Sequence, residues 1–193
     1  MWITAQLSTG RRLQLWLNSK KMGKMRTDLW KPTVAVSALI WRGDEILILH
    51  RVQPPLIWVP PGGRVEAGEQ PDAALLREVQ EETSLQNAQI VAPCIIEAGM
   101  HDGHDILFLD YVCHYVDGAI ALDPTEHDAW QWVSLKWLEA APVVLDVAPG
   151  GETVYTYGQG SSQIALSHSL DQLRFSRRIL DCLNVKAAHS PML

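Results

Sequence analysis

The stretch of sequence that most constrains this chain is GRVEAGEQPDAALLREVQEETSL, residues 63–85. A proline followed by strong helix formers predicts a helix over residues 71–84. On that helix Glu78, Glu81 and Glu82 are spaced i, i+3 and i+4, so their carboxylates lie on one face. Leucine and valine side chains fall on a different side. The sequence therefore predicts a helix with one buried face and one acidic face.

The acidic face predicts a metal site. Three like charges side by side destabilise a helix unless something positive lies between them, and no lysine stands at matching spacing. A hard divalent cation meets this need, because Mg²⁺ takes oxygen ligands and keeps waters that substrate phosphates can replace. The preceding loop, residues 58–63, ends in two glycines that can bring the backbone close to a ligand. The alternative is a solvated helix whose acids only keep the chain soluble.

The same segment resembles the signature of the Nudix hydrolase family. That signature reads Gly, five residues, Glu, seven residues, then Arg-Glu-apolar-any-Glu-Glu-any-Gly-apolar. The matching positions here are Gly63, Glu69, Arg77, Glu78, Val79, Glu81, Glu82 and Leu85. The departure is Ser84, where the family has glycine. A glycine there suits a left-handed helix exit, which a serine reaches only at a cost.

The resemblance implies a fold and an activity. The fold is an α/β/α sandwich around a mixed β-sheet. The activity is hydrolysis of a phosphoanhydride in a nucleoside diphosphate linked to another moiety, with Mg²⁺ or, as an alternative, Mn²⁺. Nucleoside triphosphates, nucleotide sugars, ADP-ribose and dinucleoside polyphosphates all remain open as substrates. Carried over by position, the implied metal ligands are Gly63 through its carbonyl, Glu78, Glu81 and Glu82.

The resemblance also implies catalytic residues. Arg77 is expected to orient a glutamate of the helix by a charge-assisted hydrogen bond, and Glu69 to brace the loop. The family often adds an acid from a later loop, for which Glu126 is our candidate and Asp123 and Asp128 are rivals. An acidic surface turn is the alternative reading of that segment. The proton of the attacking water is expected to go to Glu81 or Glu126.

Three further residues are assigned to substrate binding. Arg51 ends a predicted strand and is a reasonable phosphate contact. Arg64 lies within the signature, beside the loop glycines. Trp58 could stack on a nucleobase, or it could equally fill the core beside the two prolines.

The rest of the chain predicts one α/β domain over residues 32–183, after a basic extension, 1–31, and before a flexible tail, 184–193. Strands are expected at residues 33–41, 45–52, 88–97, 105–116 and 129–134. Helices are expected at residues 71–84, 135–140 and 162–183, the last from a stripe of leucines. The Gly- and Pro-rich stretch 142–160 is ambiguous.

Composition excludes several classes of protein. The net charge of −6 argues against a dedicated nucleic-acid binder, and no apolar run approaches the ~18 residues of a membrane span. Cys94, Cys113 and Cys182 are widely spaced and predict reduced core thiols. With no signal-peptide pattern, we expect a cytoplasmic protein that acts on a small nucleotide-type molecule, without nucleic-acid or membrane partners.

Residues 1–31 carry seven basic residues against one acid. A flexible or partly helical extension is the simplest interpretation, and a targeting or anionic-surface segment is an alternative. Its apolar residues could also dock on a second subunit and make a homodimer. Two rival functions remain for the whole chain: a Nudix-fold module that senses a nucleotide without cleaving it, and an acidic α/β interaction protein. The intact glutamate trio counts against the sensor.

Overall fold

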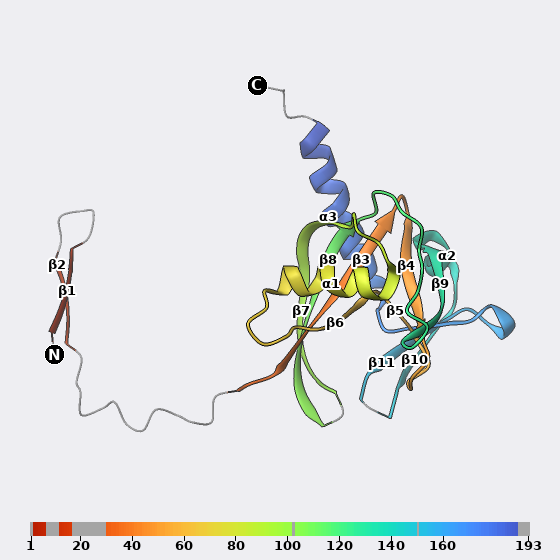
Figure 1. Ribbon diagram of the computed structural model, residues 1–193, viewed down its shortest axis with the longest axis horizontal. Helices are drawn as coiled ribbons and strands as arrows, with labels where there is room; N and C mark the ends of the chain where they lie inside the picture. The colour runs from red at the N-terminus through yellow and green to blue at the C-terminus, as the bar shows by residue number, and fades with distance from the viewer. Residues whose placement is uncertain (1, 7–11, 17–29, 102, 150, 189–193) are drawn as a thin grey trace. The chain divides into compact units, whose positions relative to one another are not determined.

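The computed structural model describes residues 2–6, 12–16, 30–101, 103–149 and 151–188 (Figure 1). By its internal contacts the chain divides into two units, residues 1–31 and 32–193. In the first unit, strands β1 (Trp2–Gln6) and β2 (Arg12–Trp16) pair in antiparallel fashion. The described residues of the basic extension thus include two paired strands and no helix, whereas the sequence predicted a flexible or partly helical segment.

The second unit is built on one sheet with helices on both faces. The strand order is β10-β11-β12-β5-β4-β3-β8-β7, with β6 added beside β3 and β9 beside β4. The strands are β3 (Thr33–Arg42), β4 (Glu45–Arg51), β5 (Trp58–Val59), β6 (Gly62–Arg64), β7 (Gln89–His101), β8 (His104–His114), β9 (His127–Ser134), β10 (Val143–Val147), β11 (Thr153–Tyr157) and β12 (Ile164–Leu166). The helices are α1 (Pro71–Thr83), α2 (Leu135–Ala140) and α3 (Leu170–Ala188), with a 3₁₀ turn at Gly160–Ser162. No helix in these ranges combines the length and apolar character needed to cross a membrane.

Two hydrophobic clusters hold the helices to opposite faces of the sheet. Side chains alternate along a strand, so successive residues of β3 face opposite layers. Ala38 and Ile40 pack in the cluster that contains Leu75 of α1. Leu39 packs in the other cluster, with Leu173 of α3. Because β3 pairs with β8 in parallel and with β4 in antiparallel fashion, the sheet is mixed, and the predicted α/β/α sandwich is confirmed.

The cleft arises where β3 and β4 separate. The two strands pair only beside their hairpin, at Trp41↔Ile46 and at the next pair of residues. Beyond that point β3 takes β6 as its neighbour and β4 takes β5. The sheet is therefore split into two halves, and a cleft of about 810 Å³ is lined by strands of both.

Several sequence predictions about elements need correction. The last helix begins at Leu170, eight residues later than predicted, because residues 164–166 pair with β5 and β11 as strand β12. It continues to Ala188, into the segment predicted as a flexible tail. The ambiguous stretch 142–160 contains the β10–β11 hairpin. All three cysteines are free, yet Cys182 is exposed and is not a core thiol.

Candidate active site

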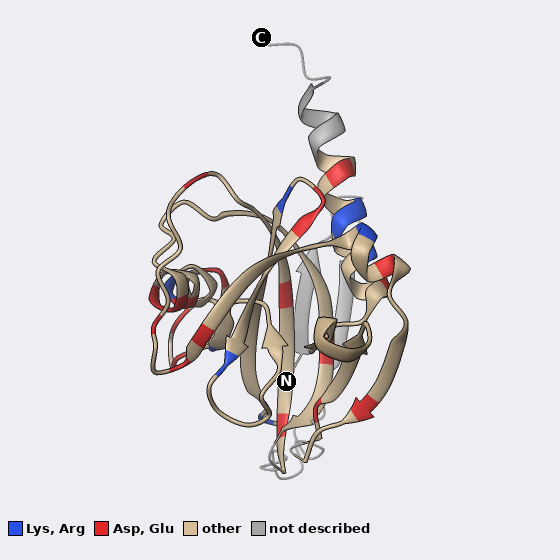
Figure 2. Ribbon diagram, turned by 90° about the vertical axis from the view of Figure 1, so that its right-hand side faces the viewer, with Lys and Arg blue, Asp and Glu red and all other residues tan. Residues whose placement is uncertain are grey.

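Helix α1 presents the acidic face to the glycine loop and its leucine face to the core. Pro71 occupies its first turn, and the chain leaves the helix at Ser84, whose φ of 61° is left-handed. Leu75 and Val79 are fully or almost fully buried against the sheet. In Figure 2 acidic positions gather on this helix around one basic position, and α3 carries charges of both signs as well. The local sequence thus fixes which side of α1 carries the carboxylates.

Arg77 connects the helix to the loop that precedes it. Its guanidinium donates to both carboxylate oxygens of Glu69 at 3.0 Å and to the carbonyl of Arg64 at 3.1 Å. It also donates to Glu78 at 2.8 Å and to Glu81 at 3.1 Å. The hydrogen bonds to Glu69 are the main reason that the pKa of Arg77 is raised, and the same bonds lower the pKa of Glu69. Arg77 therefore holds two helix carboxylates and the loop in one arrangement.

The two loop glycines lie directly against the helix carboxylates. The Gly62 N–H donates to Glu82 Oε2 at 2.8 Å. A Cβ atom placed on Gly63 would lie 2.4 Å from the Glu78 carboxylate carbon, closer than any side chain can stand. Burial is the main reason that the pKa of Glu78 is raised. Residue 63 must be glycine for Glu78 to stay where it is.

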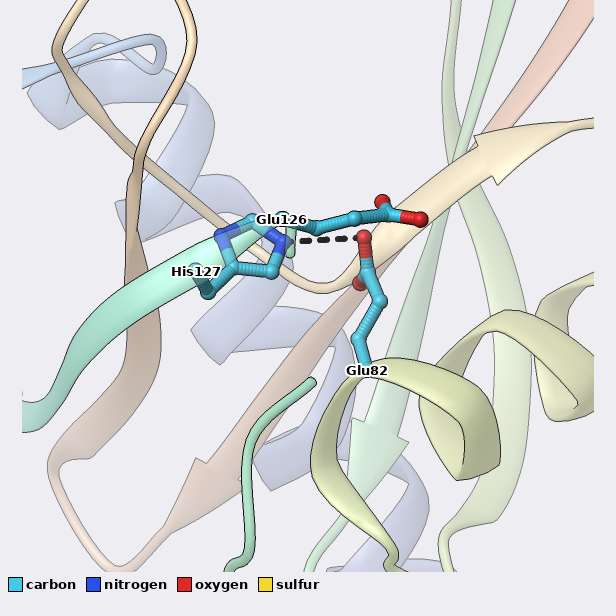
Figure 3. Close-up of side chains that lie close together, drawn as sticks. All are labelled: Glu82, Glu126 and His127. Atoms are coloured by element: carbon cyan, nitrogen blue, oxygen red, sulfur yellow. Dashed lines mark hydrogen bonds and ion pairs between the residues drawn. The ribbon is translucent and has the colours of Figure 1, made fainter. Parts of the chain in front are cut away.

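Glu82 meets Glu126, which immediately precedes β9, and His127, the first residue of that strand (Figure 3). The ligand atoms of Glu82, Glu126 and His127 all lie within 4.8 Å of one another. Figure 3 shows Glu82 rising from α1 toward the His127 ring, and the His127 Nε2 atom lies 3.0 Å from Glu82 Oε1. Glu82 is only 4% exposed. Burial raises its pKa, although the bonds to His127 and Gly62 oppose that rise.

This donor set fits a divalent cation. A buried carboxylate is costly to ionise without a positive partner, and Glu82 already draws an imidazole toward it. Burial lowers the pKa of His127, but the contact with Glu82 outweighs it, so the pKa is raised overall. Carboxylate oxygens are the ligands that Mg²⁺ prefers, and imidazole nitrogen is accepted more readily by Mn²⁺. Glu82 and Glu126 supply the first kind of ligand and His127 the second.

The three candidate acids near the start of β9 have different surroundings. Glu126 lines the cleft and approaches Glu82, as described above. Asp123 accepts hydrogen bonds from the backbone and hydroxyl of Thr125, and Asp128 lies 2.6 Å from His50 Nδ1. Of the three acids, Glu126 is the one that forms a group of possible ligands with Glu82 and His127.

Sequence reasoning missed His127. In the folded chain His127 is the buried first residue of β9. The signal available in the sequence was its position next to Glu126. The spacing predicted that Glu81 would lie beside Glu78 and Glu82. Its side chain is 59% exposed and is bound by Arg77, and it does not line the cleft.

The residues assigned to substrate binding divide into two groups. Arg51 and Arg64 line the cleft. Trp58 packs against the cluster on the α3 side of the sheet, with its ring centroid 5.1 Å from that of His50. This position corresponds to the core-filling alternative for Trp58. The Arg51 guanidinium is already paired with Glu152, at 3.3 Å.

The cleft also holds a buried polar row between the two halves of the sheet. Asp110 of β8 accepts a hydrogen bond from Ser37 and lies 3.1 Å from His168 Nε2. The other ring nitrogen of His168 lies 2.8 Å from the hydroxyl of Ser167, just after β12. Burial opposes the charge of Asp110, but His168 and Ser37 outweigh it and the pKa is lowered. This polar row thus connects β3 and β8 to the end of β12, on the opposite side of the cleft.

Comparison with known proteins gives consistent relatives. The chain is 33% identical over 122 residues to an RNA pyrophosphohydrolase of Gluconobacter oxydans, which is 54% of this chain and 71% of that relative. It is 41% identical over 75 residues to an ADP-ribose pyrophosphatase of Methanocaldococcus jannaschii, covering 35% of this chain and 44% of that one. The chain covers less than half of the length of that ADP-ribose pyrophosphatase and of a Mycobacterium tuberculosis relative named for 8-oxo-dGTP diphosphatase activity, which it matches at 43% identity over 60 residues.

Solved structures agree in fold. A Caenorhabditis elegans Ap4A hydrolase superposes with a TM-score of 0.50 and 26% identity, over 54% of this chain and 81% of that one. A MutT protein from Methanosarcina mazei superposes with a TM-score of 0.53 over 81% of this chain and 98% of that one, at 22% identity. The model of the NUDIX domain matches residues 31–153, well over half of the chain, and includes the α1 glutamates, the glycine loop and Glu126. The chain therefore belongs to the NUDIX domain family.

Proposed function

We propose that this protein is a divalent-metal-dependent pyrophosphohydrolase acting on a nucleoside diphosphate linked to another moiety. The observation that carries the proposal is the convergence of Glu82 and Glu126 beside the glycine loop, at a cleft of about 810 Å³. That volume suits a nucleotide-sized ligand. The relatives named as pyrophosphohydrolases and pyrophosphatases support the reaction class.

The residues that would hold the cation are Glu78 and Glu82, with the Gly63 carbonyl and Glu81 as further ligands; Glu126 lies beside Glu82 and is assigned to proton transfer. When bound, Mg²⁺ or Mn²⁺ supplies a Lewis acid for the phosphoryl oxygens and lowers the pKa of water. Arg77 keeps Glu78 and the loop in place, so the ligands are arranged before the cation arrives. Arg51 is positioned for a substrate phosphate from the wall of the same cleft.

Glu126 is the better of the two proposed general bases. Glu126 lines the cleft next to Glu82, whereas Glu81 does not line it and is bound by Arg77. In the proposed reaction a Glu126 oxygen accepts the proton of the attacking water, and the oxygen of that water forms a bond to phosphorus. The phosphoanhydride bond breaks, and the leaving phosphate carries the electron pair.

The proposal names a class of substrate and not a single molecule. The names of the relatives refer to RNA, ADP-ribose and Ap4A. Hydrolysis of a phosphoanhydride bond is common to these reactions, whereas the group that leaves differs. RNA with a 5′-phosphoanhydride therefore joins the candidates, although the net charge predicted no nucleic-acid partner. The cytoplasmic location and the homodimer stay predictions. A nucleotide-sensing module is the alternative function.

The decisive test is a phosphate- and pyrophosphate-release screen over a nucleotide panel, with and without Mg²⁺. We expect metal-dependent release from at least one phosphoanhydride, and a loss of roughly 100-fold or more in kcat/KM for Glu82→Gln. Glu139→Gln is the matched control, because Glu139 pairs with Arg174 away from the cleft. Binding of a nucleotide without any release would support the sensor instead. Unchanged turnover in Glu82→Gln would remove Glu82 from the metal site.

A further inference from the structure

Arg51 and Glu152 form an ion pair inside the cleft. Arg51 Nη1 lies 3.3 Å from both carboxylate oxygens of Glu152. The two side chains are 25% and 20% exposed, so the pair is partly shielded from solvent. Arg51 ends β4, and Glu152 lies 101 positions further along the chain, just before β11. The contact therefore depends on the fold and is not a local feature of either strand.

Glu152 has a second partner in the same cleft. Its Oε1 atom lies 3.1 Å from Nδ1 of His101, at the end of β7. His101 comes from the half of the sheet that contains β3 and β8, whereas Arg51 comes from the half that contains β4. The Glu152 carboxylate thus lies between a guanidinium and an imidazole from opposite sides of the cleft.

A guanidinium uses the same N–H donors for a carboxylate and for a phosphate. Glu152 occupies Nη1 of Arg51, and Nη2 donates to the Pro54 carbonyl at 3.5 Å. A phosphate that binds through Nη1 must therefore take donors that Glu152 holds. A ligand without phosphate needs none of those donors. The charge of Glu152 therefore weakens the binding of phosphorylated ligands and leaves the binding of unphosphorylated ligands unchanged.

From this geometry we infer that Glu152 is a specificity-determining residue, which sets how strongly the cleft prefers phosphorylated over unphosphorylated ligands by competing for Arg51. The inference rests on the proposed function, since it assumes that Arg51 receives a substrate phosphate. It assigns Glu152 no contact with the reacting phosphorus. Removing the charge of Glu152 should increase the preference for a diphosphate.

The test measures binding of ADP and of adenosine to the full chain by ligand-observed NMR, in EDTA so that no divalent cation contributes. Glu152→Gln should bind ADP about two- to fivefold more tightly, as expected for release of a partly exposed ion pair. Its affinity for adenosine should equal that of the wild type. Glu139→Gln, which breaks an arginine–glutamate pair outside the cleft, should change neither affinity.

The double variant distinguishes competition from a general charge effect. Arg51→Gln should weaken ADP binding, and Arg51→Gln/Glu152→Gln should bind ADP as weakly as Arg51→Gln alone. An equal gain from Glu152→Gln in both backgrounds would overturn the inference, as would no gain or a loss in the single variant. If this cycle holds but no nucleotide is hydrolysed, the proposed function fails and the inference stands. If hydrolysis occurs but the cycle fails, the inference alone is wrong.

Discussion

Ser84 offers a direct test of how the acidic helix ends. It is the only non-glycine residue with positive φ in the part of the chain that the structure describes, at φ 61° and ψ 8°. A residue with a Cβ pays about 1–2 kcal/mol in this region. The Ser84 hydroxyl, however, donates to the Ala121 carbonyl at 3.0 Å. The serine therefore combines an unfavourable backbone with a favourable side-chain contact that glycine could not make.

Two substitutions separate these contributions. Ser84→Ala keeps the strain and loses a hydrogen bond worth about 0.5–1.5 kcal/mol, so its free energy of unfolding should fall by about 1 kcal/mol. Ser84→Gly also loses the bond but relieves the strain, so its stability should lie within about 0.5 kcal/mol of the wild type. The backbone N–H bond from Ser84 to Gln80 is retained in both. The glycine variant should thus exceed the alanine variant by about 1 kcal/mol.

Urea denaturation followed by circular dichroism gives both values, provided that the slope of free energy against urea is unchanged. Equal stabilities for the glycine and alanine variants would show that the left-handed backbone at Ser84 carries no strain. A glycine variant less stable than the alanine variant would show that α1 ends in another conformation in solution.

Three further predictions concern the site, the buried row and the thiols. Gly63→Ala should displace the Glu78 carboxylate and raise the Mg²⁺ concentration for half-maximal activity about tenfold or more, with little change in Tm; an unchanged metal requirement would contradict the contact. Asp110→Asn should lower the free energy of unfolding by about 3 kcal/mol at neutral pH. Because the pKa of Asp110 is lowered on folding, its contribution is present above the unfolded value near 4 and is lost as pH falls further, so wild type and variant should converge in acid titrations. Cys182 should react first with a thiol reagent, because burial raises the pKa of the other two cysteines to about 12; simultaneous labelling of all three would refute that order.

The parts of the fold that could be predicted are those decided by neighbouring residues. Helix α1 was expected at residues 71–84 and lies at Pro71–Thr83, because Pro71 and the helix formers after it act locally. The turn between β3 and β4 is equally local, with Gly43 at a φ of 63°. The same holds for the face shared by Glu78 and Glu82, since helical spacing alone determines it.

The elements that were missed depend on which strands pair. The leucine stripe assigned to the last helix included Leu166, but Leu166 pairs with Trp58, more than a hundred positions away, as part of β12. Residues 143–147 form a strand although every one of them is exposed, so no alternation of burial marks it. In both cases pairing with another strand, which a sequence does not display, decides the structure.

Adjacent acids could not be distinguished from sequence for a related reason. Glu81 and Glu82 are about 100° apart around the helix, so they face different neighbours. Arg77, one turn earlier, draws Glu81 toward the exposed side. Glu82 instead meets the Gly62 N–H and the His127 ring. Those two partners belong to strands, and only the folded sheet determines which acid they reach.

The register between β4 and β9 brings Arg51 next to the proposed metal site. Arg51 pairs with His127, directly after an irregularity in the ladder at His50 and Arg51. A shift of one residue would turn every side chain of β9 to the opposite face and remove His127 from Glu82. Bulges of this kind re-aim side chains beside functional sites. The irregularity at His50 and Arg51 therefore sets where Arg51 lies relative to the Glu82–Glu126 cluster. The competition of Glu152 for Arg51 depends on the same irregularity.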